Sequence, residues 1–275
     1  MFNGTFTATA AAKSLSTAPH FNNPTTPITV RFSSSTGIPQ IPDTDPNADP
    51  RGLAVRFNLG DRVHTDLITH STPFFPTRTG GEFLEFLQAL ASSGPDAPSP
   101  TPIEAFLGSH HAALAHVQAP KPAPVSFATE PYFGVTALKF INAEGKATHF
   151  RFRITPDAGV ATLEAAALKE RDPNFLYEEI SKRVAEGPVT YKLLAQIAEE
   201  GDVVDDATVQ WPETRQLLEL GTIKLETAVQ DNDTEQKRII YDPIPRVQGI
   251  EPSDDPLLEL RAAVYLISGR ARRAA

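Results

Sequence analysis

Short segments of the chain alternate between hydrophobic and polar residues. In residues 28–33, three apolar side chains alternate with polar ones, so that Arg31 and Ser33 share the face opposite the apolar side chains. This pattern predicts a half-buried β-strand. It places both polar groups on one surface, where they suit a ligand contact better than a charge within a core. Residues 63–68 alternate in the same way and predict a second strand.

Turn and helix signals complete an α+β pattern. Residues 137–142 and 148–154 flank Ala143-Glu144-Gly145-Lys146, which by turn chemistry predicts a β-hairpin. Helices are expected over residues 81–91, 102–117 and 174–186, and from Pro256 nearly to the end of the chain. Proline-rich residues 38–50, 93–102 and 119–124 predict loops that punctuate the fold without dividing it.

The last of these helices carries the chemistry. At 3.6 residues per turn, one of its stripes holds Arg261, Tyr265, Ser268 and Arg272, and the neighbouring apolar stripe includes Val264. An arginine one turn from a tyrosine favours the phenolate, which is a hard anionic ligand suited to ferric iron. The alternative from these residues alone is a surface helix with a half-buried tyrosine.

An arginine four residues before a tyrosine resembles the proximal helix of the haem catalases, whose iron ligand is a tyrosine. Other segments resemble that family in the same order along the chain, most closely its small catalase-related peroxidases. These segments are Gly4-Thr5-Phe6, Val30-Arg31-Phe32-Ser33-Ser34-Ser35-Thr36-Gly37, Asp49-Pro50-Arg51-Gly52, Asp66-Leu67-Ile68-Thr69-His70-Ser71-Thr72-Pro73, Trp211-Pro212 and Tyr241-Asp242-Pro243.

The resemblance implies a fold and a cofactor. The fold would be a catalase-like antiparallel β-barrel with packed helices, forming a single haem domain over residues 1–275 without a C-terminal flavodoxin-like domain. The cofactor would be haem b, with Tyr265 as the axial iron ligand and Arg261 as the partner of its phenolate. The other implied site residues are Arg31 and Arg272 at the haem propionates, Ser33 as support on the distal side, and Phe75 and Phe83 in the haem pocket.

One part of the family pattern has no counterpart. The distal histidine of catalases belongs to a His-Ala-Lys-Gly-like motif upstream of the Gly4 segment, so the chain is expected to be short at its N-terminus. The position of the distal asparagine holds His70, or Ser71 if the register shifts by one. The chain could belong to a longer protein, use another distal group such as His70, or bind haem without peroxidase function. His70 could also be an ordinary core or loop histidine.

The implied function is consumption of hydrogen peroxide or an organic hydroperoxide, with a small organic electron donor as a further partner. Two alternatives remain: a haem-binding protein with little peroxide activity, and an enzyme that rearranges fatty-acid hydroperoxides. The family resemblance also implies a homo-oligomer, for which we expect a dimer.

Composition narrows the partners and the compartment. The net charge of -9 and a pI near 5.3 argue against a nucleic-acid partner or an anionic membrane surface. No apolar run approaches the roughly 20 residues that span a bilayer, and the first residues carry no recognisable signal peptide. These features predict a cytoplasmic protein. The chain has no cysteine, which excludes disulfides and thiolate ligands.

Overall fold

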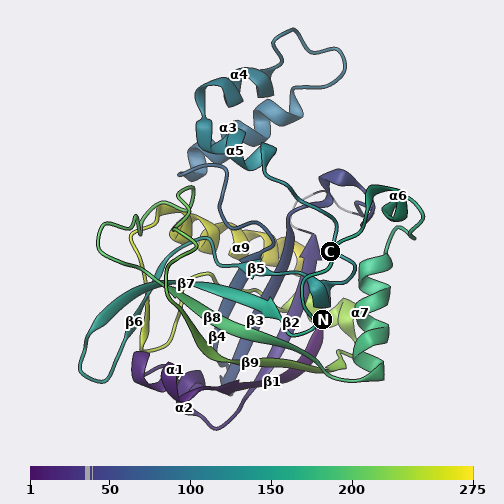
Figure 1. Ribbon diagram of the computed structural model, residues 1–275. Coiled ribbons are helices and arrows are strands. Elements are labelled where there is room, and N and C mark those ends of the chain that lie inside the picture. The colour runs from purple at the N-terminus through teal and green to yellow at the C-terminus, as the bar shows by residue number, and fades with distance from the viewer. Residues whose placement is uncertain (35–37, 39, 275) are drawn as a thin grey trace.

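A computed structural model describes residues 1–34, 38 and 40–274. Residues Ser35, Thr36 and Gly37 of the motif that follows Ser33, and Pro39 of the first proline-rich segment, therefore lie outside the described residues. The chain forms an antiparallel barrel surrounded by helices (Figure 1).

Eight strands close the barrel. They follow one another in the order β7-β5-β4-β3-β2-β1-β9-β8, and pairing of β8 with β7 completes the circle. The strands of the barrel are β1 (Phe2–Ala8), β2 (Thr26–Ser34), β3 (Arg51–Gly60), β4 (Val63–His70), β5 (Tyr132–Phe133), β7 (Ala147–Pro156), β8 (Val189–Ile197) and β9 (Leu217–Ala228). Strands β6 (Leu138–Ile141) and β10 (Ile250–Pro252) extend the sheet from β7. The predicted hairpin is confirmed as β6 and β7.

Apolar side chains fill the barrel and leave a polar outer face on three neighbouring strands. In β2, Ile28, Val30 and Phe32 are buried inside, as the alternation predicts. The same period of two continues in β3 and β4. The residues that β2, β3 and β4 turn outward include Arg31, Ser33, Gly52, Ala54, Arg56, Asp66, Ile68 and His70.

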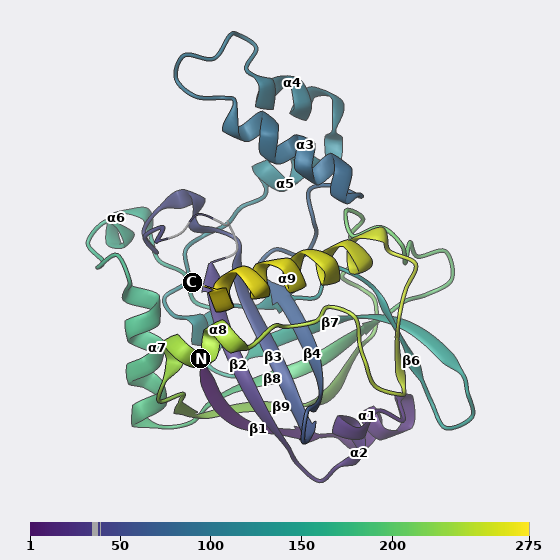
Figure 2. The ribbon, with the colours of Figure 1, turned by 180° about the vertical axis from the view of Figure 1, so that it is seen from behind.

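Helix α9 (Pro256–Ala274) crosses this outer face (Figure 2). The buried residues Leu257 and Leu258 lie in its first turn. The remaining helices near the barrel are α1 (Ala10–Leu15), α2 (Pro19–Asn22), α6 (Ala165–Leu168), α7 (Phe175–Glu186) and α8 (Asn232–Arg238), with short 3-10 turns at Pro46–Ala48 and Phe127–Thr129. Among the helices of the described residues, none is both long enough and apolar enough to cross a membrane.

Three helices project from the barrel as a separate arm (Figures 1 and 2). They are α3 (Gly80–Ala91), α4 (Pro102–Ser109) and α5 (His111–Gln118), and we call residues 79–118 the helical arm. Capping boxes at Thr79 with Glu82 and at Thr101 with Glu104 begin α3 and α4. None of the residues described in these two helices is buried, so the arm presents much of its surface to solvent.

The single helix expected over residues 102–117 is wrong, because the chain breaks it at His110. That residue has φ of -122° and ψ of 83°, outside the helical region. Its ring stacks on Phe106 with 3.8 Å between centroids, and its Nδ1 lies 2.9 Å from the Phe106 carbonyl oxygen. The side chain thus caps one helix and lets the next begin in a new direction.

Candidate active site

A cavity of about 460 Å³ lies between α9 and the outer face of β2, β3 and β4. Its volume falls within the roughly 300–1,000 Å³ typical of small-molecule sites. The strands contribute two small residues, Gly52 and Ala54, which leave room beneath the helix. The residues that line it are Arg31, Ser33, Ser34, Gly52, Leu53, Ala54, Ile68, Thr69, His70, Ile240, Tyr241, Tyr265, Ser268 and Arg272.

Five of the site residues expected from the sequence meet in this cavity, although they are spread over most of the chain. They are Arg31, Ser33, His70, Tyr265 and Arg272. Strand alternation supplies the first three, because each lies on the outward face of its strand. The helical stripe supplies the last two.

The phenol oxygen of Tyr265 accepts two hydrogen bonds from one turn earlier in α9. Arg261 donates from Nε at 3.3 Å and from Nη2 at 3.1 Å. Both donors belong to a charged group, so they stabilise negative charge on that oxygen. The predicted pairing of Arg261 with Tyr265 is therefore present in the folded chain.

Two of the arginines that line the cavity each have a buried donor without a described partner. Among the described residues, the buried Nε atoms of Arg31 and Arg272 have no hydrogen-bond partner. Arg272 donates instead from its terminal nitrogens, to Ser268 Oγ at 3.3 Å and to the Ile239 carbonyl at 2.9 Å. Burial first, and then the positive charges of Arg31 and Arg273, lower the pKa of Arg272. A ligand with carboxylate groups would satisfy these donors.

His70 ends β4 on the same surface. Burial first, and then the positive charge of Arg261 and the ring of His116, lower its pKa to about 3. The imidazole is therefore neutral at ordinary pH. Gly52 pairs with Ser33 on the neighbouring strand β2 and with His70 on the neighbouring strand β4. Ser33 and His70 therefore lie two strand spacings apart, roughly 9–10 Å.

Ser71, the residue after His70, is hydrogen-bonded to Arg51 of β3. The Ser71 hydroxyl accepts a hydrogen bond from the Arg51 backbone N–H at 2.9 Å, and the Ser71 N–H donates to the Arg51 carbonyl at 2.8 Å. Of the two candidates for the distal position, His70 lines the cavity.

Phe75 and Phe83 lie outside this lining as far as the chain is described. Their rings pack on each other with 4.9 Å between centroids. Phe75 also packs against the buried group of Val135, Ala207 and Leu257 near the start of α9. Their placement in a haem pocket stays a prediction.

Sequence reasoning missed a network that holds one wall of the cavity. Asp66 accepts hydrogen bonds from Arg56 Nε at 2.8 Å and Nη2 at 2.7 Å, and its side chain is fully buried. It also accepts from the Asp242 backbone N–H at 2.8 Å, while Arg56 donates to the Ile240 carbonyl. These bonds anchor residues 239–246, which we call the connecting segment, to the barrel. Arg56 and Asp66 are cross-strand neighbours in the β3–β4 hairpin, which is the signal that could have revealed them.

Tyr241 of the connecting segment lies between two arginines. The guanidinium carbon of Arg31 is 4.7 Å from its ring centroid and that of Arg56 is 5.3 Å away. Such contacts are favourable, because the ring face attracts a cation. The ring thus positions Arg31 beside the cavity without using its Nε.

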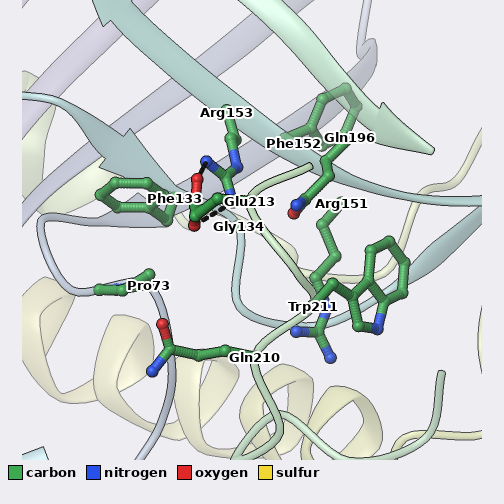
Figure 3. A pocket seen from close by; sticks show the side chains of 10 residues that line it. All are labelled: Pro73, Phe133, Gly134, Arg151, Phe152, Arg153, Gln196, Gln210, Trp211 and Glu213. Carbon is green, nitrogen blue, oxygen red and sulfur yellow. Dashed lines mark hydrogen bonds and ion pairs between the residues drawn. The ribbon is translucent and has the colours of Figure 1, made fainter. Parts of the chain in front are cut away.

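A second hollow, beside β7, is filled by its own partners (Figure 3). Its volume is about 10 Å³, room for little more than one water molecule. Arg151 lies over the Trp211 ring at 4.5 Å, and Arg153 pairs with Glu213 at 2.7 Å. The cavity beneath α9 is therefore the better candidate for a site.

The chain is similar to known proteins of one family. A protein-family model described as Catalase matches residues 2–275. A catalase-related peroxidase of Mycolicibacterium paratuberculosis is 34% identical over 279 residues, covering 99% of this chain and 86% of that protein. Another, of Synechococcus elongatus, is 33% identical over 268 residues, covering 96% of this chain and 78% of the relative.

Solved structures match the fold. A fungal catalase superposes with a TM-score of 0.86 at 22% identity, over 98% of this chain and 57% of the solved one. Catalase A from Saccharomyces cerevisiae gives 0.85 at 21% identity, over 98% and 59%. The chain thus spans less than three-fifths of each solved chain. The predicted catalase-like antiparallel barrel with packed helices is confirmed.

We expect Asp66→Asn to destabilise the fold by about 3 kcal/mol, because it removes a fully buried charge from its ion pair with the half-buried Arg56 guanidinium. Urea unfolding measures the change. The control is Asp205→Asn, whose carboxylate pairs with Arg78 at the exposed surface and should matter little. Equal stability losses in the two variants would show that the network does not anchor the connecting segment.

Proposed function

Because the chain belongs to the catalase family, we propose that it is a haem-dependent enzyme that consumes hydroperoxides. The observation that carries this proposal is one cavity in which Tyr265, with its two donors from Arg261, lies together with the unused donors of Arg31 and Arg272. Peroxide consumption follows from membership of the family and from the peroxidases that resemble the chain. The ligation and the site roles are finer proposals.

The residues around the cavity fit haem b. Two buried guanidinium nitrogens without partners among the described residues suit its two propionates. Gly52 and Ala54 leave a shallow floor for a flat ring. The Tyr265 oxygen accepts two hydrogen bonds from Arg261 and would suit ferric iron as a ligand. When bound, haem supplies the iron centre at which peroxide is reduced.

Side chains of the protein would accept the proton of the hydroperoxide and return it. Cleavage of a hydroperoxide requires a base that takes a proton from one oxygen and an acid that returns it to the other. His70 is neutral and faces the cavity, so a ring nitrogen can accept that proton and give it back. Ser33 faces the same space two strands away and would support the substrate with its hydroxyl.

The substrates that suit this site are hydrogen peroxide and small organic hydroperoxides, with a small organic molecule as electron donor. Oxygen evolution or dye oxidation on addition of peroxide marks the enzyme. A Soret band without turnover would mark a haem-binding protein with little peroxide activity. Conversion of a fatty-acid hydroperoxide without a donor would mark a rearranging enzyme.

Tyr265→Phe should lose most of its haem or shift the Soret band, because it removes the oxygen that would ligate the iron. Absorption spectra and haem content of the purified variant test this. Tyr177→Phe, on α7 and outside the cavity lining, is the matched control and should keep both. An unchanged spectrum in Tyr265→Phe would exclude this tyrosine as the ligand.

Arg31→Ala and Arg272→Ala should each weaken haem binding roughly 10- to 100-fold, since a hydrogen bond to a charged group contributes about 1.5–3 kcal/mol. Haem titration measures the affinity, and circular dichroism checks the fold. The control is Arg238→Ala, an exposed arginine paired with Glu235 on α8. Wild-type affinity in both cavity variants would contradict the propionate assignment.

His70→Gln should slow peroxide consumption by about 10²-fold, the lower range for loss of a positioned acid-base group. Because the pKa of His70 is lowered to about 3, its proton-accepting form persists over the range of about pH 5 to 8. Protonation of His70 should therefore not lower the wild-type rate anywhere in that pH range. His64→Gln, on the same strand outside the cavity, is the control. Fast turnover by His70→Gln would place the base elsewhere.

A further inference from the structure

A further cavity, of about 300 Å³, lies where β4 begins, on the same outer face of the barrel as the cavity beneath α9. The outward side of β4 carries Asp66, which lines the further cavity, and then His70, which lines the first. The walls include Arg62 and Val63 of the β3–β4 hairpin and Arg246 of the connecting segment, which crosses this face beside α9 (Figure 2). We call this cavity the hairpin groove. Its volume suits a small molecule.

The network of Arg56 and Asp66 lies between the hairpin groove and the cavity beneath α9. In the connecting segment, Tyr241 lines the cavity and the next residue, Asp242, lines the groove. In β4, Ile68 lines the cavity and Asp66, two residues earlier, lines the groove. A molecule in the groove would therefore lie beside the proposed haem site without taking the space that a peroxide needs.

The carboxylates of the groove already have partners within the fold. Both oxygens of Asp66 accept hydrogen bonds from Arg56, and one of them also accepts from the Asp242 backbone N–H. The side chain of Asp242 accepts from the Ile244 backbone N–H at 2.9 Å and from Arg246 Nε at 2.8 Å. The negative charges of the groove therefore need no cation from outside.

The two arginines of the groove instead keep donors unused. Arg62 forms no hydrogen bond or ion pair with any other described residue. Within the described chain, Arg246 donates from Nε alone, so both of its terminal nitrogens remain available. Arg62 also holds φ of 59°, in the left-handed region, which is unfavourable for a residue with a side chain. Residues in such conformations cluster at functional sites. The unused donors suit an anion.

The groove also offers apolar surface to a ligand. Val63, next to Arg62, is 53% exposed, and Ile244 lies in the wall that the connecting segment forms. An inorganic anion would leave these side chains uncovered. A small organic anion would use both parts of the groove, because its carboxylate can accept from the arginines while a flat ring lies against the apolar side chains.

We propose that the hairpin groove binds the electron donor of the peroxidase reaction, and that this donor is an aromatic carboxylate with two ring hydroxyls. The proposal rests on the proposed function. The donor loses two electrons and two protons from its hydroxyls and becomes a quinone. The hydroperoxide takes them, its O–O bond breaks, and an alcohol and water form. The electrons cross the wall in which Tyr241 lies next to Asp242. Because groove and cavity are separate, donor and peroxide can be bound together.

Titration calorimetry of the full chain tests binding directly, with protocatechuate as the probe and catechol as the matched molecule without a carboxylate. The wild-type chain should bind protocatechuate about 10-fold more tightly than catechol. Arg62→Gln and Arg246→Gln should each raise the protocatechuate Kd about 10-fold, because each removes charged donors to the carboxylate. The control is Arg270→Gln, an exposed arginine of α9 outside the groove, which should bind both probes as the wild type does. Circular dichroism checks the fold of each variant.

Steady-state kinetics with peroxide and protocatechuate separates a donor site from simple binding. Each groove variant should lose kcat/KM for protocatechuate through a KM raised about 10-fold, in step with its Kd. Equal protocatechuate affinity in the wild type and both groove variants, or equal wild-type affinity for the two probes, overturns the groove as a carboxylate site. Weaker binding without a change in KM overturns its role as the donor site. If no chain consumes peroxide, the proposed function and the donor role both fail, and the titrations still decide whether the groove binds this class of anion.

Discussion

The ion pair between the half-buried Arg56 and the buried Asp66 is the constraint on which the candidate site depends. Asp66 accepts from Arg56 and from the backbone of Asp242, and Arg56 reaches the carbonyl of Ile240. A single ion pair between two barrel strands therefore fixes the chain that leads into α9. The Ile239 carbonyl in turn accepts a hydrogen bond from Arg272. Because a buried charge is costly when unpaired, any movement of the connecting segment that separated these groups would be strongly unfavourable. The positions of Tyr241 and Arg272, and with them the cavity wall, follow from this pair.

The barrel explains why a polar site can form on an otherwise apolar framework. Its interior takes the apolar residues of β2, β3 and β4, and the period of two sends the intervening residues outward. An outward arginine in a barrel strand would normally face water. Here α9 covers that face, so Arg31, Ser33 and His70 are enclosed without entering the core. The small side chains of Gly52 and Ala54 then keep the helix from filling the space beneath it. The cavity is thus a consequence of alternation, residue size and one covering helix.

Local patterns predicted the parts of this site that depend on local geometry. Alternation in residues 28–33 placed Arg31 and Ser33 on one face, and helical spacing placed Arg261 beside Tyr265, as observed. The break at His110 depends on stacking with Phe106 and was invisible to helical periodicity. The pair of Arg56 and Asp66 required the register of the β3–β4 hairpin. Which of His70 and Ser71 lines the cavity depended on the point at which β4 ends, because the Ser71 hydroxyl accepts a hydrogen bond from the Arg51 backbone. Residue spacing alone could not predict that segments far apart in the sequence meet in one site, and that expectation came from the family resemblance.

The charge balance of the cavity indicates what kind of ligand it serves. Its lining, over the described residues, includes Arg31 and Arg272 but neither aspartate nor glutamate, and Arg261 approaches from the side of Tyr265. Burial first, and then the positive charges of Arg31 and Arg273, lower the pKa of Arg272. Among the described lining residues, no carboxylate lies beside Arg31 or Arg272 in the way that Asp66 lies beside Arg56. An anionic ligand with two carboxylates would relieve the repulsion and satisfy both buried nitrogens at once, so binding and local stability should rise together.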